Sequence, residues 1–372
     1  MVGAIHQGYG RIRNMSNKPK IYGVKRLLSD NNPKWERTDN AVGLTATASI
    51  GTETVGYSDF NNIMPWKGMV RETLSTGDVM VYIPTFWYQR WQADGYEYIR
   101  ISPKKQSKFS KHPGSNRYFG AYLTSTDNMS KSGTKIRVSK YAYQVENLAR
   151  DKGKGWHEID IHILSAIQML FIVEFATNNS QETVGKGWTT GSASSNISDI
   201  VLNGTCDNVA NLTGRASGTD GKTVVVYRGI ESLWGTIVKD INGLNISPTK
   251  YYICTDPDKY EYDTTTNYDA LSYVMPTGYP YRTITQMGYD ERYPWIMLPS
   301  VVESDTYNDY TKGYCDFSFS KYGANNRWYY NTQGGTWYNG DGSGLFCGFY
   351  LGGAKDDAST NHHGSCLMYI PE

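Results

Sequence analysis

A few histidine and carboxylate side chains lie close enough in the sequence to suggest metal chemistry. His157 and His162 flank Glu158 and Asp160 within one short segment. Two histidines that bind zinc from one helix are spaced i, i+4, whereas this pair is spaced i, i+5 and would lie on different faces. The spacing favours polar residues at the start of a helix over a metal site.

Aspartates downstream suggest calcium, because Asp256 and Asp258 have the first spacing of a calcium-binding loop. Tyr260 then occupies the third ligand position and Glu261 the position of the turn glycine, so the signature fails. Asp356 and Asp357 are adjacent, so their side chains should diverge instead of forming the carboxylate pair of a glycosidase. The sequence therefore predicts no metal, no cofactor and no catalytic residue.

Composition limits the classes of partner. The 372 residues carry 37 basic and 36 acidic side chains, so no electrostatic attraction to nucleic acid or to an anionic membrane is implied. The sequence has no apolar leader and no run of about 20 apolar residues, which predicts no membrane insertion. It is rich in tyrosine and glycine, as β- and loop-rich proteins on particle surfaces are. Its cysteines are odd in number and far apart, which argues against a disulfide framework: Cys206, Cys254, Cys315, Cys347 and Cys366.

Periodicity predicts both strands and helices. Strands are expected at 21–27 and 42–48, and a hairpin is expected in 79–102 with its turn at Ala93-Asp94-Gly95. One helix is expected at 139–152. A second, apolar on nearly all sides and therefore buried, is expected at 157–177 with Asp160 as its N-cap. His112, a lone histidine, is expected to be part of the scaffold.

The stretch from Tyr322 to Glu372 interleaves glycines and buried-type aromatics with Tyr, Asn, Asp, Ser, Thr and His. Antigen-binding surfaces use a similar set, because tyrosine offers a large rigid face and Asn, Ser and Gly offer adaptable hydrogen bonding. We expect a stiff frame that displays exposed ligand-binding side chains. The candidates are Tyr329, Tyr330, Asn331, Tyr338, Asn339, Asp341, Cys347, Phe349, Tyr350, Asp356, Asp357, Thr360, Asn361, His362 and His363.

The run GGTWYNGDGSGLF, Gly334 to Phe346, with a closing Gly-x-x-Leu at Gly364–Leu367, resembles the variable region of diversity-generating retroelement variable proteins. The chain departs from the common pattern at Ser365-Cys366. Tyr227–Ile246 is similar to a core segment of formylglycine-generating-type domains, where Trp234 would be buried and Arg228 and Glu231 would form an internal ion pair or bond to the backbone. Trp35–Leu44 and 79–102 resemble phage tail proteins of the same kind.

The resemblance implies an α+β C-type lectin fold of the formylglycine-generating-enzyme-like type, with long loop insertions and a small β-rich N-terminal segment. Residues 1–60 would form an N-terminal segment for attachment to other tail proteins or for oligomerisation. Residues 61–372 would form the ligand-binding domain, with the variable region at about 322–372. The implied function is that of a hypervariable receptor-binding protein at the tip of a phage tail fibre, assembled in the host cytoplasm. Its partners would be a bacterial cell-surface protein or glycan, other tail proteins through the N-terminal segment, and further copies of itself, a trimer among the options.

Three alternatives stay open. The first is a formylglycine-generating-type enzyme, which would need two closely placed reactive thiols late in the chain, and Cys347 and Cys366 are the candidates. The second is an invariant structural protein of the virion. The third is a location on the bacterial cell surface.

Overall fold

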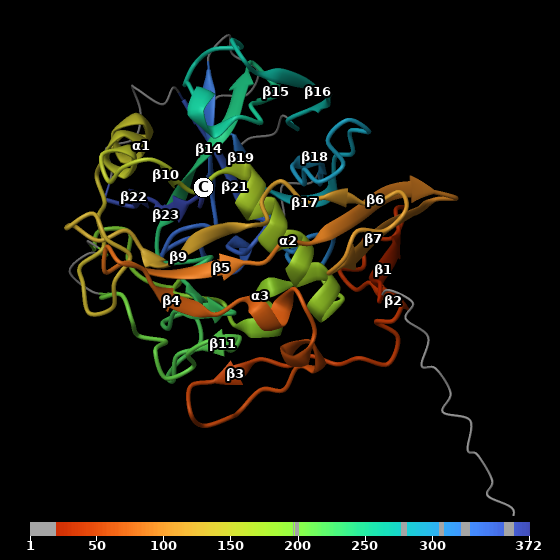
Figure 1. The fold of residues 1–372 in the computed structure, drawn as a ribbon, viewed down its shortest axis with the longest axis horizontal. Coiled ribbons are helices and arrows are strands. Elements are labelled where there is room, and N and C mark those ends of the chain that lie inside the picture. Colours follow the sequence, from red (N-terminus) through yellow and green to blue (C-terminus); the bar gives the residue numbers. More distant parts are fainter. Residues whose placement is uncertain are drawn as a thin grey trace, which may run out of the picture.

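The helix expected at 157–177 becomes α2 (Ile161–Phe175), which runs through the middle of the molecule in this computed structural model (Figure 1). The structure describes residues 20–195, 197, 201–276, 281–304, 309–320, 328–352 and 361–372. Asp160 caps α2 as predicted, because its Oδ1 accepts the N–H of Ile163 at 2.8 Å. Nearly every side chain of α2 is buried, since the helix packs against β14 (Val238–Ser247), β7 (Tyr96–Ser102) and β1 (Tyr22–Leu27).

Strands dominate the described residues, which confirms a β-rich fold, and they form four mostly antiparallel sheets. The first has the order β2 (Glu36–Asp39), β1 (Tyr22–Leu27), β7 (Tyr96–Ser102), β6 (Trp87–Ala93) and β8 (Ser110–Lys111). The second has the order β10 (Trp156–Glu158), β23 (Cys366–Tyr369), β9 (Arg117–Leu123), β5 (Val79–Ile83) and β4 (Arg71–Thr73).

The third sheet is small, with the order β13 (Ile230–Glu231), β12 (Val225–Tyr227), β11 (Gly214–Arg215) and β3 (Ser49–Ile50). The largest has the order β16 (Asp269–Val274), β15 (Lys250–Ile253), β14 (Val238–Ser247), β20 (Tyr329–Gln333), β21 (Gly348–Gly352), β19 (Phe317–Ser320), β17 (Tyr281–Met287) and β18 (Pro299–Val302). A short β22 (His363–Gly364) pairs in parallel with β14. The remaining elements are α1 (Ala142–Arg150), α3 (Ser180–Val184), η1 (Asp59–Asn62), η2 (Trp66–Gly68), η3 (Pro257–Lys259) and η4 (Gly340–Gly342).

Several local predictions are confirmed and two are wrong. β6 and β7 form the expected hairpin, and Asp94 and Gly95 both take positive φ, as a two-residue turn of this hand requires. The strand expected at 42–48 is absent from the described chain, where turns lead to the short β3. His157 and Glu158 belong to β10 instead of the long helix.

The described part of the N-terminal segment belongs to the main body. β1 lies between β2 and β7 in one sheet, and Tyr22, Val24 and Trp35 contribute to the large hydrophobic core. An attachment role for residues 1–60 stays a prediction, and residues 1–19 lie outside the described part of the chain.

A buried ion pair joins α2 to the turn between β12 and β13. Arg228 and Glu231 do not pair with each other: Arg228 Nη2 donates to Glu174 Oε1 of α2 at 2.5 Å. Glu231 instead accepts the backbone N–H groups of Gly204 and Cys206, at 2.9 and 2.8 Å. Trp234 is fully buried, as predicted.

Candidate ligand-binding surface

The tyrosines of β20 are buried, so the expectation that Tyr329, Tyr330 and Asn331 are exposed was wrong. β20 is an interior strand of the largest sheet, between β14 and β21. Tyr330 packs against Ala142 of α1 and Tyr262, whereas Tyr329 belongs to the main core. Both faces of the strand are therefore covered.

The exposure expected for three further candidates was also wrong. Tyr350 is fully buried, with its ring edge-on to Tyr251 at 6.1 Å between centroids. Cys347 packs with Val238 and Phe317. His363 is buried beside Asp240, with Nδ1 3.4 Å from Oδ1. These side chains therefore belong to the interior and not to an exposed face.

The other candidates with described side chains come from two segments, 338–341 and 361–362, that meet at the buried indole of Trp337 through Tyr338 and His362. The ring of Tyr338 lies edge-on to Trp337, with centroids 5.1 Å apart, and 5.8 Å from the imidazole of His362. We call the following five half-buried or exposed residues the Trp337 surface: Tyr338, Asn339, Asp341, Asn361 and His362. Asp356, Asp357 and Thr360 lie outside the described residues, as does the side chain of Phe349.

Hydrogen bonds fix the loop that presents this surface. Trp337 Nε1 donates to the carbonyl of Ser192 at 2.8 Å, and Asn339 Oδ1 accepts both the N–H and the hydroxyl of Thr336. Gly335 has a φ of 74°, and a Cβ there would lie 2.3 Å from Ser343 Oγ, so the turn requires glycine. The backbone of the loop is thus constrained, while the half-buried Tyr338 and the exposed Asp341 remain accessible to solvent.

An open polar depression of about 640 Å³ adjoins the Trp337 surface at Asp341. Lys186 Nζ lies 2.6 Å from Asp341 Oδ1, and this hydrogen bond raises the pKa of the lysine. The depression is lined by Asn179, Gln181, Glu182, Lys186, Asp220, Asp309, Tyr310, Thr311 and Asp341. Four carboxylates against one lysine give this lining a negative charge.

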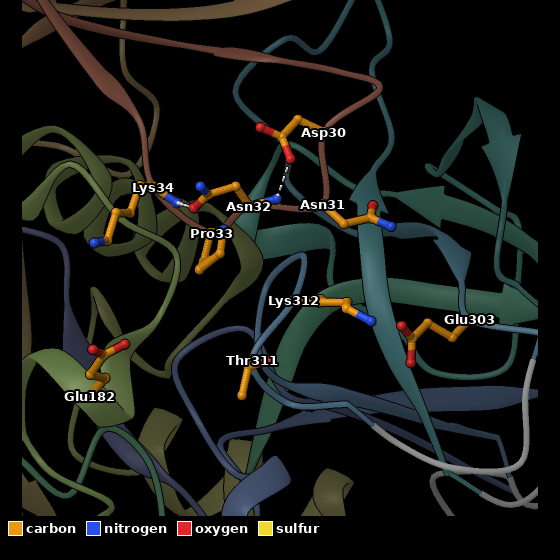
Figure 2. A pocket seen from close by; sticks show the side chains of 9 residues that line it. All are labelled: Asp30, Asn31, Asn32, Pro33, Lys34, Glu182, Glu303, Thr311 and Lys312. Atoms are coloured by element: carbon orange, nitrogen blue, oxygen red, sulfur yellow. Dashed lines mark hydrogen bonds between the residues drawn. The ribbon is translucent and has the colours of Figure 1, made fainter.

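A second depression, of about 570 Å³, shares Glu182 and Thr311 with the first and so continues it (Figure 2). Its far wall is the 30–34 segment, where Asp30 Oδ1 accepts the N–H of Asn32 and Asn32 Oδ1 accepts the N–H of Lys34, at 2.9 and 3.0 Å. The two depressions together form a polar groove over loops that are distant in sequence.

Protonation states on this surface follow from local contacts. Lys312 and Thr311 hydrogen-bond to Asp309 and lower the pKa of its carboxyl to about 2. Burial lowers the pKa of His362 to about 3, with the neighbouring His363 as a lesser cause. Near neutral pH the surface therefore offers carboxylates, a neutral imidazole and a phenol as hydrogen-bonding groups.

The residues first considered for chemistry occupy structural positions. Asp160 is buried and pairs with Arg117 at 2.5 Å, and His162 Nδ1 lies 3.3 Å from the same carboxylate. His112 is buried, and its Nδ1 accepts the N–H of Gly114, in line with a scaffold role. No group of three or more His, Cys, Asp or Glu among the described residues could hold a metal ion.

The two late cysteines are deeply buried. Burial raises the pKa of both Cys347 and Cys366, and the ammonium of Lys239 opposes this shift at each thiol. A raised thiol pKa is the reverse of what a reactive cysteine needs.

Sequence reasoning missed most of the groove. Gln181 and Glu182 come from α3, a short helix that the sequence did not predict, and Asp309 and Tyr310 come from a loop more than 120 residues later. Among the described residues that line the groove, Asp341 is the one that the sequence predicted as a site residue.

A scan of protein-family models finds no match for the chain, and a search of curated proteins finds none either. Within the described residues, each helix is too short or too polar to cross a bilayer.

Proposed function

We propose that this chain is a ligand-binding protein of C-type lectin type, a receptor-binding protein of a phage tail, and that the Trp337 surface and the adjoining groove hold its ligand. One observation carries the proposal. Tyr338 and Asp341 lie on a loop whose backbone is fixed by buried contacts; Tyr338 contacts His362 of the 361–362 segment, and Asp341 lines an open polar groove. Such an arrangement lets side chains change while the frame stays constant.

The chemistry of the lining favours a hydroxyl-rich ligand, such as a cell-surface glycan, over an apolar one. The groove offers carboxylates, amides and a tyrosine, all suited to hydrogen bonding with sugar hydroxyls. Its negative charge disfavours an acidic polysaccharide. A protein receptor is the other option for the same surface.

A pull-down of host-surface fractions by the immobilised full chain tests the proposal. Changing Tyr338 and Asp341 together to alanine should reduce the retained receptor by roughly tenfold or more, because two contacts of about 1 kcal/mol each are lost. The matched control is Tyr57→Ala, since Tyr57 is 60% exposed and lies outside this surface. Equal retention by all three proteins would refute the site.

Pretreatment of the fractions separates the two receptor classes. Periodate, which cleaves sugar diols, should abolish retention if the ligand is a glycan, whereas protease should abolish it if the receptor is a protein. The gene offers a separate test of diversification: a near-identical template repeat with adenines at the codons of the exposed residues, beside a reverse-transcriptase gene.

The burial of Tyr329, Tyr330 and Tyr350 favours a second candidate, an invariant structural protein of the virion. Such a protein would need the same stiff frame but no diversified surface. A gene without a template repeat, together with no retained receptor, would support this alternative.

A further inference from the structure

The outer face of the sheet formed by β2, β1, β7 and β6 carries an unusual set of aromatic side chains. Burial alternates along β7: Glu97, Ile99 and Ile101 point inward, while Tyr96 and Tyr98 point outward and are half-buried. Such alternation is typical of a sheet with one face on the core and one toward solvent. The outward face is therefore available for contact.

Five outward side chains, which we call the aromatic ladder, touch one another in sequence: Lys25, Tyr96, Tyr98, Trp91 and Arg100. The rings of Trp91 and Tyr98 are parallel within 7°, with centroids 4.5 Å apart. The Arg100 guanidinium lies 5.0 Å from the Trp91 ring, and Lys25 Nζ lies 5.2 Å from the Tyr96 ring. Because Trp91 already has Tyr98 and Arg100 against it, its ring is not a free platform for stacking a sugar or a base.

The charged residues of the aromatic ladder are paired within this face. Lys25 Nζ pairs with Glu36 Oε2 at 3.1 Å, and Arg100 Nε pairs with Asp39 Oδ2 at 2.8 Å. The two cations and two anions of these pairs cancel, with both signs side by side, and Lys111 of β8, opposite Trp87 at the edge of the sheet, adds one positive charge. A face of this kind can meet its own copy without repulsion and can exchange ion pairs across a two-fold axis.

The sheet behind the ladder is held rigid from the inside. Glu97 lies between two arginines, with Arg26 Nε at 3.0 Å from Oε2 and Arg90 Nη2 at 2.5 Å from Oε1. Arg90 also donates to the carbonyls of Gly288 and Ile296. A rigid face loses little conformational entropy on binding, which favours association.

We propose that the aromatic ladder is a self-association surface, which docks on the same face of a second copy of this chain. Tyr, Trp and Arg are the residues most enriched at the energetic centres of protein interfaces, and all three occur here. No ladder residue lines either depression of the groove, so this face is separate from the proposed ligand-binding site. An isologous contact needs a self-complementary surface, which the paired charges supply.

Sedimentation velocity of the full chain over about 1 to 100 µM tests the proposal, a range that brackets modest dimer affinities. The wild type should show a concentration-dependent dimer. Trp91→Ala and Tyr98→Glu should each weaken dimerisation about tenfold or more, the second because two like charges would meet near the axis. The control, Tyr57→Ala, should dimerise like the wild type, and circular dichroism checks that each variant is folded.

A charge exchange makes the test independent of the aromatic variants. Lys25→Glu alone should weaken the dimer, and adding Glu36→Lys should restore it, because the pair is rebuilt with reversed polarity. A wild type that stays monomeric throughout, or a dimer that none of these changes affects, would overturn the proposal. Binding of a glycan or another protein at this face, with the chain monomeric, would overturn it as well.

Discussion

Replacing Tyr350 by alanine should destabilise the protein strongly, although the sequence placed this residue on a variable, exposed face. The side chain is fully buried in the middle of β21, which lies between β20 and β19. Its ring packs edge-on against Tyr251, and the two hydroxyls are 3.4 Å apart. Few changes at this position could be accommodated.

The magnitude follows from the cavity that the change would leave. Removing a buried aromatic ring costs about 3–5 kcal/mol in lost transfer free energy and unfilled volume. Tyr251 keeps a partner, because its hydroxyl also donates to the carbonyl of Pro299 at 3.0 Å, so little is added for an unsatisfied group. For comparison, Tyr338→Ala removes a half-buried ring at the surface and should cost about 1 kcal/mol.

Urea denaturation followed by tryptophan fluorescence and circular dichroism measures both losses in the free energy of unfolding. Tyr350→Phe, which keeps the ring and removes one hydroxyl, serves as the conservative control and should cost about 1 kcal/mol. If Tyr350→Ala and Tyr338→Ala cost the same, the division into a buried frame and a tolerant surface is refuted.

Three further predictions concern buried charges. Burial lowers the pKa of Lys239 to about 8, whereas the pKa of lysine in the unfolded chain is about 10.4. The free energy of unfolding should therefore rise as the pH increases from about 8 to about 10.4. Lys239→Met should remove this pH dependence and stabilise the protein by up to about 3 kcal/mol near pH 7. Burial raises the pKa of Glu231 from its ordinary value of 4.5 to about 7. The stability that the protonated side chain contributes is therefore complete below about pH 4.5 and is lost as the pH rises to about 7. Glu231→Gln should make the free energy of unfolding less dependent on pH between these two values. Glu174→Ala would leave the Arg228 guanidinium buried without its carboxylate and should cost about 3–5 kcal/mol in a urea titration.

Local signals predicted the elements that depend on neighbouring residues. Asp160 before an apolar run marked the start of α2, and Asp94-Gly95 marked the β6–β7 turn. Each signal is decided within a few residues: a side chain caps its own helix, or a pair of residues adopts positive φ. The burial of Trp234 was predicted differently, from the resemblance of the segment Tyr227–Ile246 to a core segment of formylglycine-generating-type domains, and the side chain is fully buried.

Exposure could not be predicted in the same way, because it depends on what packs over an element. The side chains that cover Tyr330 come from Ala142 and Tyr262, nearly 190 and 70 residues earlier in the chain. A strand covered on both faces and a strand with one exposed face can both hold tyrosine and asparagine. The groove was missed for the same reason, since α3 and the loop carrying Asp309 meet through the fold.

The central claim is that a fixed frame presents an exposed surface that can vary and that binds. It is tested most directly with two libraries of the full chain, one randomised at Tyr338, Asp341, Asn361 and His362 of the Trp337 surface and one at Tyr329, Tyr330, Asn331 and Tyr350. Soluble expression, a cooperative thermal transition and binding to host-surface fractions would be measured for each clone. We expect most clones of the first library to fold and to differ widely in binding, and few of the second to fold. Equal folding in both libraries, or unchanged binding throughout the first, would contradict the account.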